Sequence, residues 1–131
     1  MASPRATGAT SYDESGGALM VSNSVLRLFK VHFVNNQADS HGGALRCNNS
    51  SLIITDCVFT GNSAPNGGGG AVDCSYGSSP LLSNCEFENN TAAWGGAMSC
   101  RADSSPVVSD SRFIGNEAGG ELGFGGAVFS R

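Results

Sequence analysis

Three polar residues recur at matching places in the sequence and are candidates for chemistry. Asp56, Asn84 and Asp110 each lie three residues before a phenylalanine. If equivalent positions of successive repeats stack, the two carboxylates lie two strands apart, roughly 10 Å from each other. That separation is too wide for a retaining glycosidase pair and near the upper limit for an inverting pair. The other interpretations of this column are a calcium site and a solvated face, of which the solvated face is favoured.

The histidines do not complete a catalytic set. His32 and His41 fall at different positions of the repeat, and no Ser/His/Asp arrangement can be placed from the spacing. Lys30 is the only basic residue that shares the position of Asp56. The sequence therefore predicts a protein that is not an enzyme and needs no cofactor, with a polysaccharide lyase or hydrolase as the alternative.

Aromatic residues at one repeated position suggest a binding surface. The residue before each Gly-Gly pair is Ser15, His41, Gly68, Trp94 or Phe124. If these positions stack, Trp94 and Phe124 are neighbours, with His41 in the same column, and their rings offer a stacking platform for a sugar. The alternative is that both rings only cover apolar surface at a corner of the fold.

All five cysteines lie at repeated positions, which leaves two interpretations open. Cys47, Cys74 and Cys100 follow Gly-Gly-Ala motifs, whereas Cys57 and Cys85 lie two residues before a phenylalanine. One interpretation is buried thiols that pack as small apolar groups. The other is a pair of disulfides, Cys47–Cys57 and Cys74–Cys85, each closing a loop of about ten residues. No Cys-x-x-Cys or His-Cys spacing indicates a zinc site.

The element that must position these residues is a repeat of about 26 residues. Two independent motifs keep this period, which chance does not explain. Gly-Gly-Ala followed by an apolar residue begins at Gly16, Gly42, Gly69, Gly95 and Gly125. Phe-x-x-Asn-x-Ala contains Phe33, Phe59, Phe87 and Phe113 with Asn36, Asn62, Asn90 and Asn116. Each unit holds short β-prone runs between Gly and Asn residues, and no sustained helical periodicity is present.

Such a short β unit cannot bury its own apolar face, but copies of it can stack on one another. We therefore predict an all-β fold, a parallel β-helix of four to five rungs with about 26–28 residues in each. The phenylalanines stack ring on ring inside, and the asparagines form an amide ladder that links the rungs. Asparagine also tolerates the left-handed backbone of a corner. The glycine pair supplies positive φ and a close approach between rungs.

The pattern before each phenylalanine predicts which side chains point inward. Positions five and two residues before it are apolar or small, whereas positions one and three before it are mostly polar. The alternation slips between four and five residues before the phenylalanine, which predicts a corner there. The segments that vary in length all lie between a phenylalanine and the next Gly-Gly pair. Binding is therefore expected at that edge.

Net charge and the length of apolar runs disfavour several classes of binding partner. Seven basic and eleven acidic residues give a net charge of −4, which disfavours nucleic acid and anionic membranes. No apolar run reaches the roughly 18 residues of a membrane span. Residues 1–15 are polar and either cap the first rung or are disordered, and residues 16–131 form one β-helix domain. Unprotected strand edges at the ends of such a rod favour end-to-end self-association.

The alternation of FVNN, FTGN, FENN and FIGN with GGA[LVM] resembles the repeat of the chlamydial polymorphic outer-membrane proteins and related right-handed β-helix proteins. The resemblance implies a right-handed coil, an extracellular or cell-surface location and an adhesive passenger role toward a surface protein or glycan of a host or neighbouring cell. Without a signal peptide or membrane barrel in the chain, it also implies a piece of a longer passenger. The alternatives are a carbohydrate-active β-helix and a spacer without a ligand.

Overall fold

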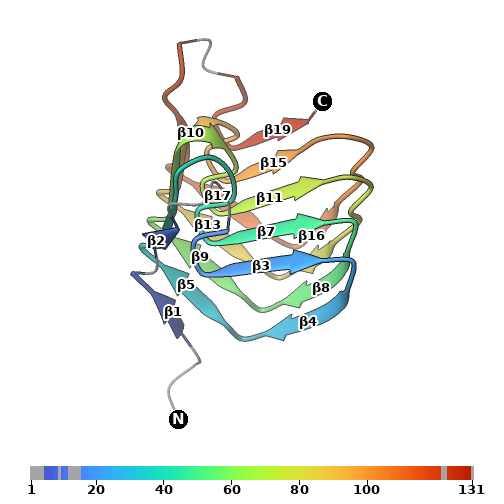
Figure 1. The fold of residues 1–131 in the computed structure, drawn as a ribbon. Coiled ribbons are helices and arrows are strands. Elements are labelled where there is room, and N and C mark those ends of the chain that lie inside the picture. Colours follow the sequence, from blue (N-terminus) through green and yellow to red (C-terminus); the bar gives the residue numbers. More distant parts are fainter. Residues whose placement is uncertain (1–4, 9, 12–15, 122–123, 131) are drawn as a thin grey trace.

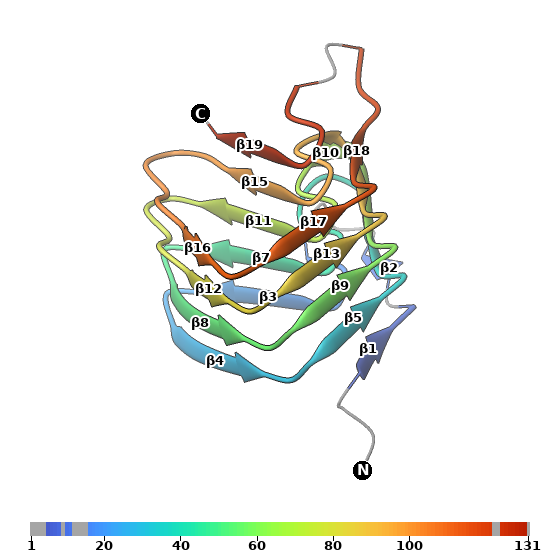
Figure 2. The same cartoon turned by 180° about the vertical axis from the view of Figure 1, so that it is seen from behind.

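The computed structural model describes residues 5–8, 10–11, 16–121 and 124–130, and every regular element in these ranges is a β-strand. The chain passes through the same four sheets in each rung, so that like strands of consecutive rungs lie side by side (Figures 1 and 2). Neighbouring strands pair in parallel, with equivalent repeat positions opposite each other. The predicted all-β parallel β-helix is therefore confirmed, with about four turns.

Four sheets run along the rod. The Phe sheet consists of β1 (Arg5–Thr7), β5 (His32–Val34), β9 (Val58–Thr60), β13 (Glu86–Glu88) and β17 (Arg112–Ile114). The Ala sheet consists of β2 (Thr10–Ser11), β6 (Gln37–Ala38), β10 (Ser63–Gly68), β14 (Thr91–Trp94) and β18 (Glu117–Ala118). The Gly-Gly-Ala sheet consists of β3 (Leu19–Ser22), β7 (Leu45–Asn48), β11 (Val72–Ser75), β15 (Met98–Cys100) and β19 (Val128–Ser130). The aliphatic sheet consists of β4 (Val25–Phe29), β8 (Ser51–Thr55), β12 (Leu81–Ser83) and β16 (Val107–Ser109).

The first two strands extend the helix beyond its first full rung. β1 pairs with β5, placing Ala6 opposite Phe33, and β2 pairs with β6. The described strands of residues 1–15 thus add one strand each to the Phe and Ala sheets. The remaining residues of that segment lie outside the described ranges.

The predicted phenylalanine column is the axis of the core. Phe33, Phe59, Phe87 and Phe113 are direct register partners. Their rings stack almost parallel, with centroids 4.9, 4.8 and 4.7 Å apart along the rod. Since this spacing equals the distance between neighbouring strands, each ring contacts the next without tilting out of its rung.

The asparagines form the predicted ladder. The backbone N–H and the Nδ2 of Asn62 both donate to Oδ1 of Asn90, at 2.9 and 3.0 Å. The same Nδ2 donates to the carbonyl of Phe33 in the preceding rung, at 3.0 Å. The pattern repeats from Asn36 to Asn62 and from Asn90 to Asn116. These buried amides therefore bind rung to rung with their hydrogen-bonding capacity largely used, as buried polar groups require.

The corners differ from the prediction in two ways. The left-handed residue is not the ladder asparagine but the residue before it, which is Asn35, Gly61, Asn89 or Gly115. The second corner lies three residues before each phenylalanine, with φ between 48° and 54°, and not between positions four and five as predicted. β4 and β8 run straight through the predicted position because its residues remain paired with the next rung. A single left-handed residue then redirects the chain.

The two glycines of each Gly-Gly-Ala motif have separate roles, as Gly69 and Gly70 illustrate. Gly69 has a φ of 70°, which side chains disfavour. A Cβ on Gly70 would overlap the carbonyl oxygen of Gly96 in the next rung. The first glycine thus makes the bend and the second permits the close approach of consecutive rungs, as predicted for the pair.

The cysteines are buried free thiols, and neither suggested disulfide, Cys47–Cys57 or Cys74–Cys85, is formed. The register places Cys47 opposite Cys74, and Cys74 opposite Cys100, on the Gly-Gly-Ala sheet. Cys57 and Cys85 lie instead at the corner between the aliphatic and Phe sheets, where their thiols donate to the carbonyls of Thr55 and Ser83. Stacking between rungs therefore decides the neighbours of each thiol, as expected for thiols that pack as small apolar groups.

Candidate functional site

The predicted aromatic platform is not assembled. The backbones of Trp94 and Phe124 are adjacent, since Gly95 N–H donates to the Phe124 carbonyl at 3.0 Å. However, the half-buried Trp94 ring lies edge-on to His41, with centroids 6.0 Å apart, whereas the exposed Phe124 ring lies 6.1 Å from Phe129. Gly68 explains this divergence: a Cβ there would overlap Trp94 Nε1, so the indole occupies space that a side chain would otherwise fill. The two rings therefore have different neighbours and do not form one surface.

The polar residues Asp56, Asn84 and Asp110 lie at the corner between the aliphatic and Phe sheets. All three residues have positive φ, a conformation that Asn and Asp adopt more readily than most residues. Asn84 Nδ2 donates to Asp56 Oδ1 at 2.6 Å, and Asp110 is exposed to solvent. In the described part of the chain, no group of three or more His, Cys, Asp or Glu side chains could hold a metal ion. Backbone conformation therefore accounts for the presence of Asp and Asn at this position.

Sequence reasoning missed a buried ionic cluster on the outer side of the Gly-Gly-Ala sheet. Asp73 alternates with the inward Val72 and Cys74, yet its side chain is 0% exposed. Its Oδ2 lies 3.4 Å from Nε of Arg46 and 3.2 Å from Nη2 of Arg101. A carboxylate is tolerated without water when it is paired and hydrogen-bonded in this way. The sequence does contain a signal for this cluster. When the repeats are aligned, Arg46 and Asp73 occupy the same position of two consecutive repeats, so opposite charges become neighbours.

A buried serine lies beside this cluster. Ser99 is the register partner of Asp73 on the next strand and is fully buried. Among the residues that the structure describes, neither its Oγ nor Trp94 Nε1 has a hydrogen-bond partner. A hydroxyl without a hydrogen-bonded base cannot be deprotonated for attack. Asp73, His41 and Ser99 are therefore not joined by the hydrogen bonds of a triad in this structure.

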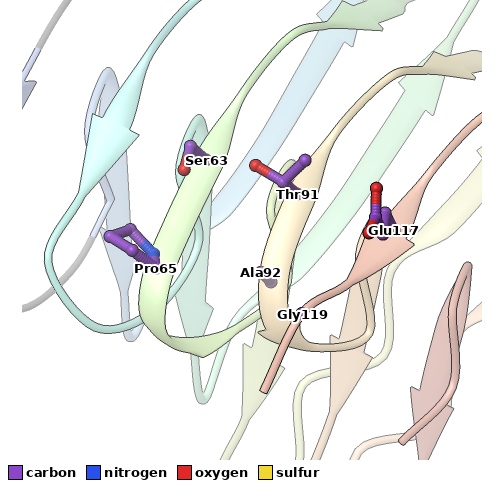
Figure 3. Close-up of a pocket in the computed structure, with 6 residues that line it drawn as sticks. All are labelled: Ser63, Pro65, Thr91, Ala92, Glu117 and Gly119. Atoms are coloured by element: carbon purple, nitrogen blue, oxygen red, sulfur yellow. The ribbon is translucent and has the colours of Figure 1, made fainter. Parts of the chain in front are cut away.

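A shallow groove of about 310 Å³ lies on the outer side of the Ala sheet (Figure 3). Side chains of Ser63, Thr91 and Glu117 project from three neighbouring strands, on which they are register partners. The rest of the lining is Pro65, Ala92 and Gly119. Two hydroxyls and one carboxylate can donate and accept hydrogen bonds across a floor of small residues. A single carboxylate in the lining provides no acid–base pair.

The groove lies at the edge where the sequence varies. Its lining residues all belong to segments between a phenylalanine and the next Gly-Gly pair, which span 9, 10, 8 and 12 residues from motif to motif. The sequence pointed to this edge but not to these residues. The available signal was a polar column four residues after each phenylalanine, namely Gln37, Ser63, Thr91 and Glu117.

Comparisons with known proteins agree with this architecture. The described residues contain no helix long and apolar enough to cross a membrane. No curated protein and no solved structure matches the chain. The family model described as "Right handed beta helix region" matches residues 7–128, nearly the whole chain. Together with the stacked parallel strands, this match shows that the chain belongs to the right-handed β-helix family.

Proposed function

We propose that this domain is a structural and adhesive β-helix module of a cell-surface or secreted protein. It binds a glycan or protein of another cell through the groove lined by Ser63, Thr91 and Glu117. The observation that carries the proposal is the position of this groove, on the face where repeat lengths vary. Repeat proteins commonly bind partners on the face that carries their insertions, since the stacked core is insulated from changes there.

The lining chemistry favours binding over catalysis. Thr91 and Glu117 are exposed and Ser63 is half-buried, so their polar atoms are available to a ligand. Sugar hydroxyls and peptide groups can both pair with hydroxyl and carboxylate oxygens. Likeness to the chlamydial repeat is consistent with an extracellular adhesive role. Nucleic acid is disfavoured as a partner because the net charge of −4 repels phosphates.

A steric variant tests the groove without opening the core. Thr91→Arg places a long side chain in the groove from an exposed position. The control variant, Ser51→Arg, places the same side chain at an exposed position of β8, outside the groove. The labelled domain is applied to a printed glycan array and to cultured epithelial cells. We expect saturable binding that falls at least tenfold in Thr91→Arg and is unchanged in Ser51→Arg.

Two outcomes would replace this proposal. Absence of saturable binding to both the array and the cells would favour a ligand-free spacer. Release of unsaturated or reducing ends from polygalacturonate, abolished in Glu117→Gln or Asp110→Asn, would favour the carbohydrate-active alternative.

End-to-end association of this chain is tested separately by light scattering over a concentration series, and a constant monomer mass would contradict it.

A further inference from the structure

The cysteines form two columns with different surroundings. Cys47, Cys74 and Cys100 lie on three consecutive strands of the Gly-Gly-Ala sheet as direct register partners, and all three point into the core. Their side chains are 0%, 0% and 1% exposed. Neighbouring strands of a sheet lie about 4.8 Å apart. This spacing is within the Cα separation of roughly 4.4–6.8 Å that a disulfide can bridge.

The thiols of this column contact one another. A hydrogen bond with the Cys74 thiol lowers the pKa of Cys47. Hydrogen bonds with Cys100 and Cys47 raise the pKa of Cys74, with a further contribution from burial. Cys74 is thus the central thiol, and of the pair Cys47 and Cys74 it is Cys47 that ionises more readily.

The second column differs in its partners. The Cys57 and Cys85 thiols donate to backbone carbonyls of Thr55 and Ser83, both at 3.4 Å. Ser111 takes the equivalent place in the next rung, where its hydroxyl donates to the Ser109 carbonyl at 2.8 Å. Cys57 and Cys85 therefore make the same hydrogen bond as the serine hydroxyl at this corner, with the backbone carbonyl two residues earlier as the acceptor.

We propose that Cys74 is a redox-modification site that forms an inter-rung disulfide with Cys47 or Cys100 when a small-molecule disulfide is present during folding. With glutathione disulfide, the Cys47 thiolate attacks one sulfur and displaces a glutathione thiolate. The Cys74 thiolate then attacks the Cys47 sulfur of the mixed disulfide and displaces the second glutathione. Two protein thiols are oxidised to one disulfide, and glutathione disulfide is reduced to two glutathione molecules that take up the thiol protons.

The third thiol allows the bond to move along the column. Thiol–disulfide exchange requires a thiolate to attack one sulfur of a disulfide while the other sulfur leaves. Cys100 lies on the opposite side of Cys74 from Cys47, so its attack on Cys74 releases Cys47. Only one disulfide exists at a time, because both possible bonds use Cys74.

The geometry of neighbouring strands places strain on this bond. The Cβ atoms of a disulfide lie about 3.8 Å apart, closer than the spacing of parallel neighbours, so the two side chains must lean together. Strained disulfides are more easily reduced than relaxed ones. The strain favours reduction once the rungs open and a reductant reaches the buried sulfurs. The modification is independent of the groove and of its ligand.

The test is oxidative refolding from urea in glutathione disulfide, followed by thiol alkylation and mass spectrometry without reduction. The wild-type chain is expected to fall from five free thiols to three. Cys57→Ser/Cys85→Ser uses the serine found at Ser111 and is expected to lose the same two thiols. Cys74→Val uses the residue found at Val21, the register partner of Cys47, and is expected to lose none.

Each other outcome contradicts the proposal. Five free thiols in the refolded wild-type chain, with folding verified by circular dichroism, would exclude an inter-rung disulfide. A bond that joins Cys47 to Cys57 or Cys74 to Cys85 would show pairing within a rung. Cleavage before aspartate and after glutamate separates Cys47, Cys57 and Cys100 onto different peptides, so the Cys47–Cys57 bond is seen directly. The double serine variant excludes both within-rung bonds.

Discussion

The inner and outer columns of the rod follow different rules. Inside, Phe33, Phe59, Phe87 and Phe113 repeat one residue type with ring spacings of 4.7–4.9 Å. On the outer side of the Gly-Gly-Ala sheet, one column reads Met20, Arg46, Asp73, Ser99 and Phe129. A stack of identical side chains stabilises itself at every step. An outer column must find a complementary neighbour for each residue, as Asp73 does with Arg46.

The inner positions keep the same residue type in every rung, whereas the outer positions differ from rung to rung. The Phe and Asn columns require the same residue in every rung, because an aromatic stack or amide ladder is interrupted wherever one member changes. Outer positions tolerate change as long as charges and hydrogen bonds are compensated locally. Binding surfaces are therefore expected outside, and the rod itself depends on the inside.

The largest predicted effect comes from breaking the inner column. Phe59→Ala removes a fully buried ring with stacked neighbours on both sides, so the free energy of unfolding is expected to fall by about 4 kcal/mol. Urea denaturation followed by circular dichroism measures the change. The matched control, Phe113→Ala, removes a partly buried ring with one stacked neighbour among the described residues, and about half that loss is expected. Equal losses would show that stacking on both sides does not matter.

The outer ionic cluster is expected to respond less strongly. Asp73→Asn keeps the shape of the side chain but leaves Arg46 and Arg101 beside a neutral group, which should cost about 3 kcal/mol. Asp110→Asn makes the same change at an exposed corner, where a change within about 0.5 kcal/mol is expected. The same urea titrations measure both variants. If Asp73→Asn were as mild as Asp110→Asn, the buried ion pairs would contribute little to stability.

The smallest effect is a loss of stability at alkaline pH. Burial raises the pKa of the Cys57 and Cys85 thiols above 9.0, so in that range the unfolded chain releases protons that the folded chain retains. The stabilisation is complete below pH 9 and is lost as pH rises through the folded-state pKa. Between pH 8 and pH 10, under reducing conditions, the wild-type chain should therefore lose more of its free energy of unfolding than Cys57→Ser/Cys85→Ser. An identical pH dependence in both proteins would contradict this assignment.

Columns that repeat one residue type were predictable from the sequence, whereas the corner conformations and the neighbours of the thiols were not. The Phe stack, the Asn ladder and the roles of the glycine pair all follow from spacing, because equivalent positions must coincide in a helix of equal rungs. The position of the left-handed corners did not follow, since Asn35 and Asn36 are the same residue type and only backbone geometry distinguishes them. The suggested disulfides Cys47–Cys57 and Cys74–Cys85, one of the two interpretations of the cysteines, are not formed, and the register places Cys47 beside Cys74.

The candidate sites show the same division. Trp94 and Phe124 were placed on adjacent rungs from the sequence, but their rings diverge because Gly68 leaves room for the indole on one side only. Asp73 gave no signal in its own repeat, because an aspartate on the outer face of a strand is ordinarily solvated. Its burial arises from two arginines contributed by the preceding and following rungs.

By itself the sequence determined the period, the all-β class, the parallel stacking and the identity of the inner columns, because these depend on the recurrence of residue types at fixed intervals. Tertiary structure alone decided the conformation of each corner, the burial of Asp73, the groove between Ser63 and Glu117 and the grouping of the thiols. The physical reason is that recurrence specifies which positions coincide between rungs. The direction a side chain takes depends on the space its neighbours leave.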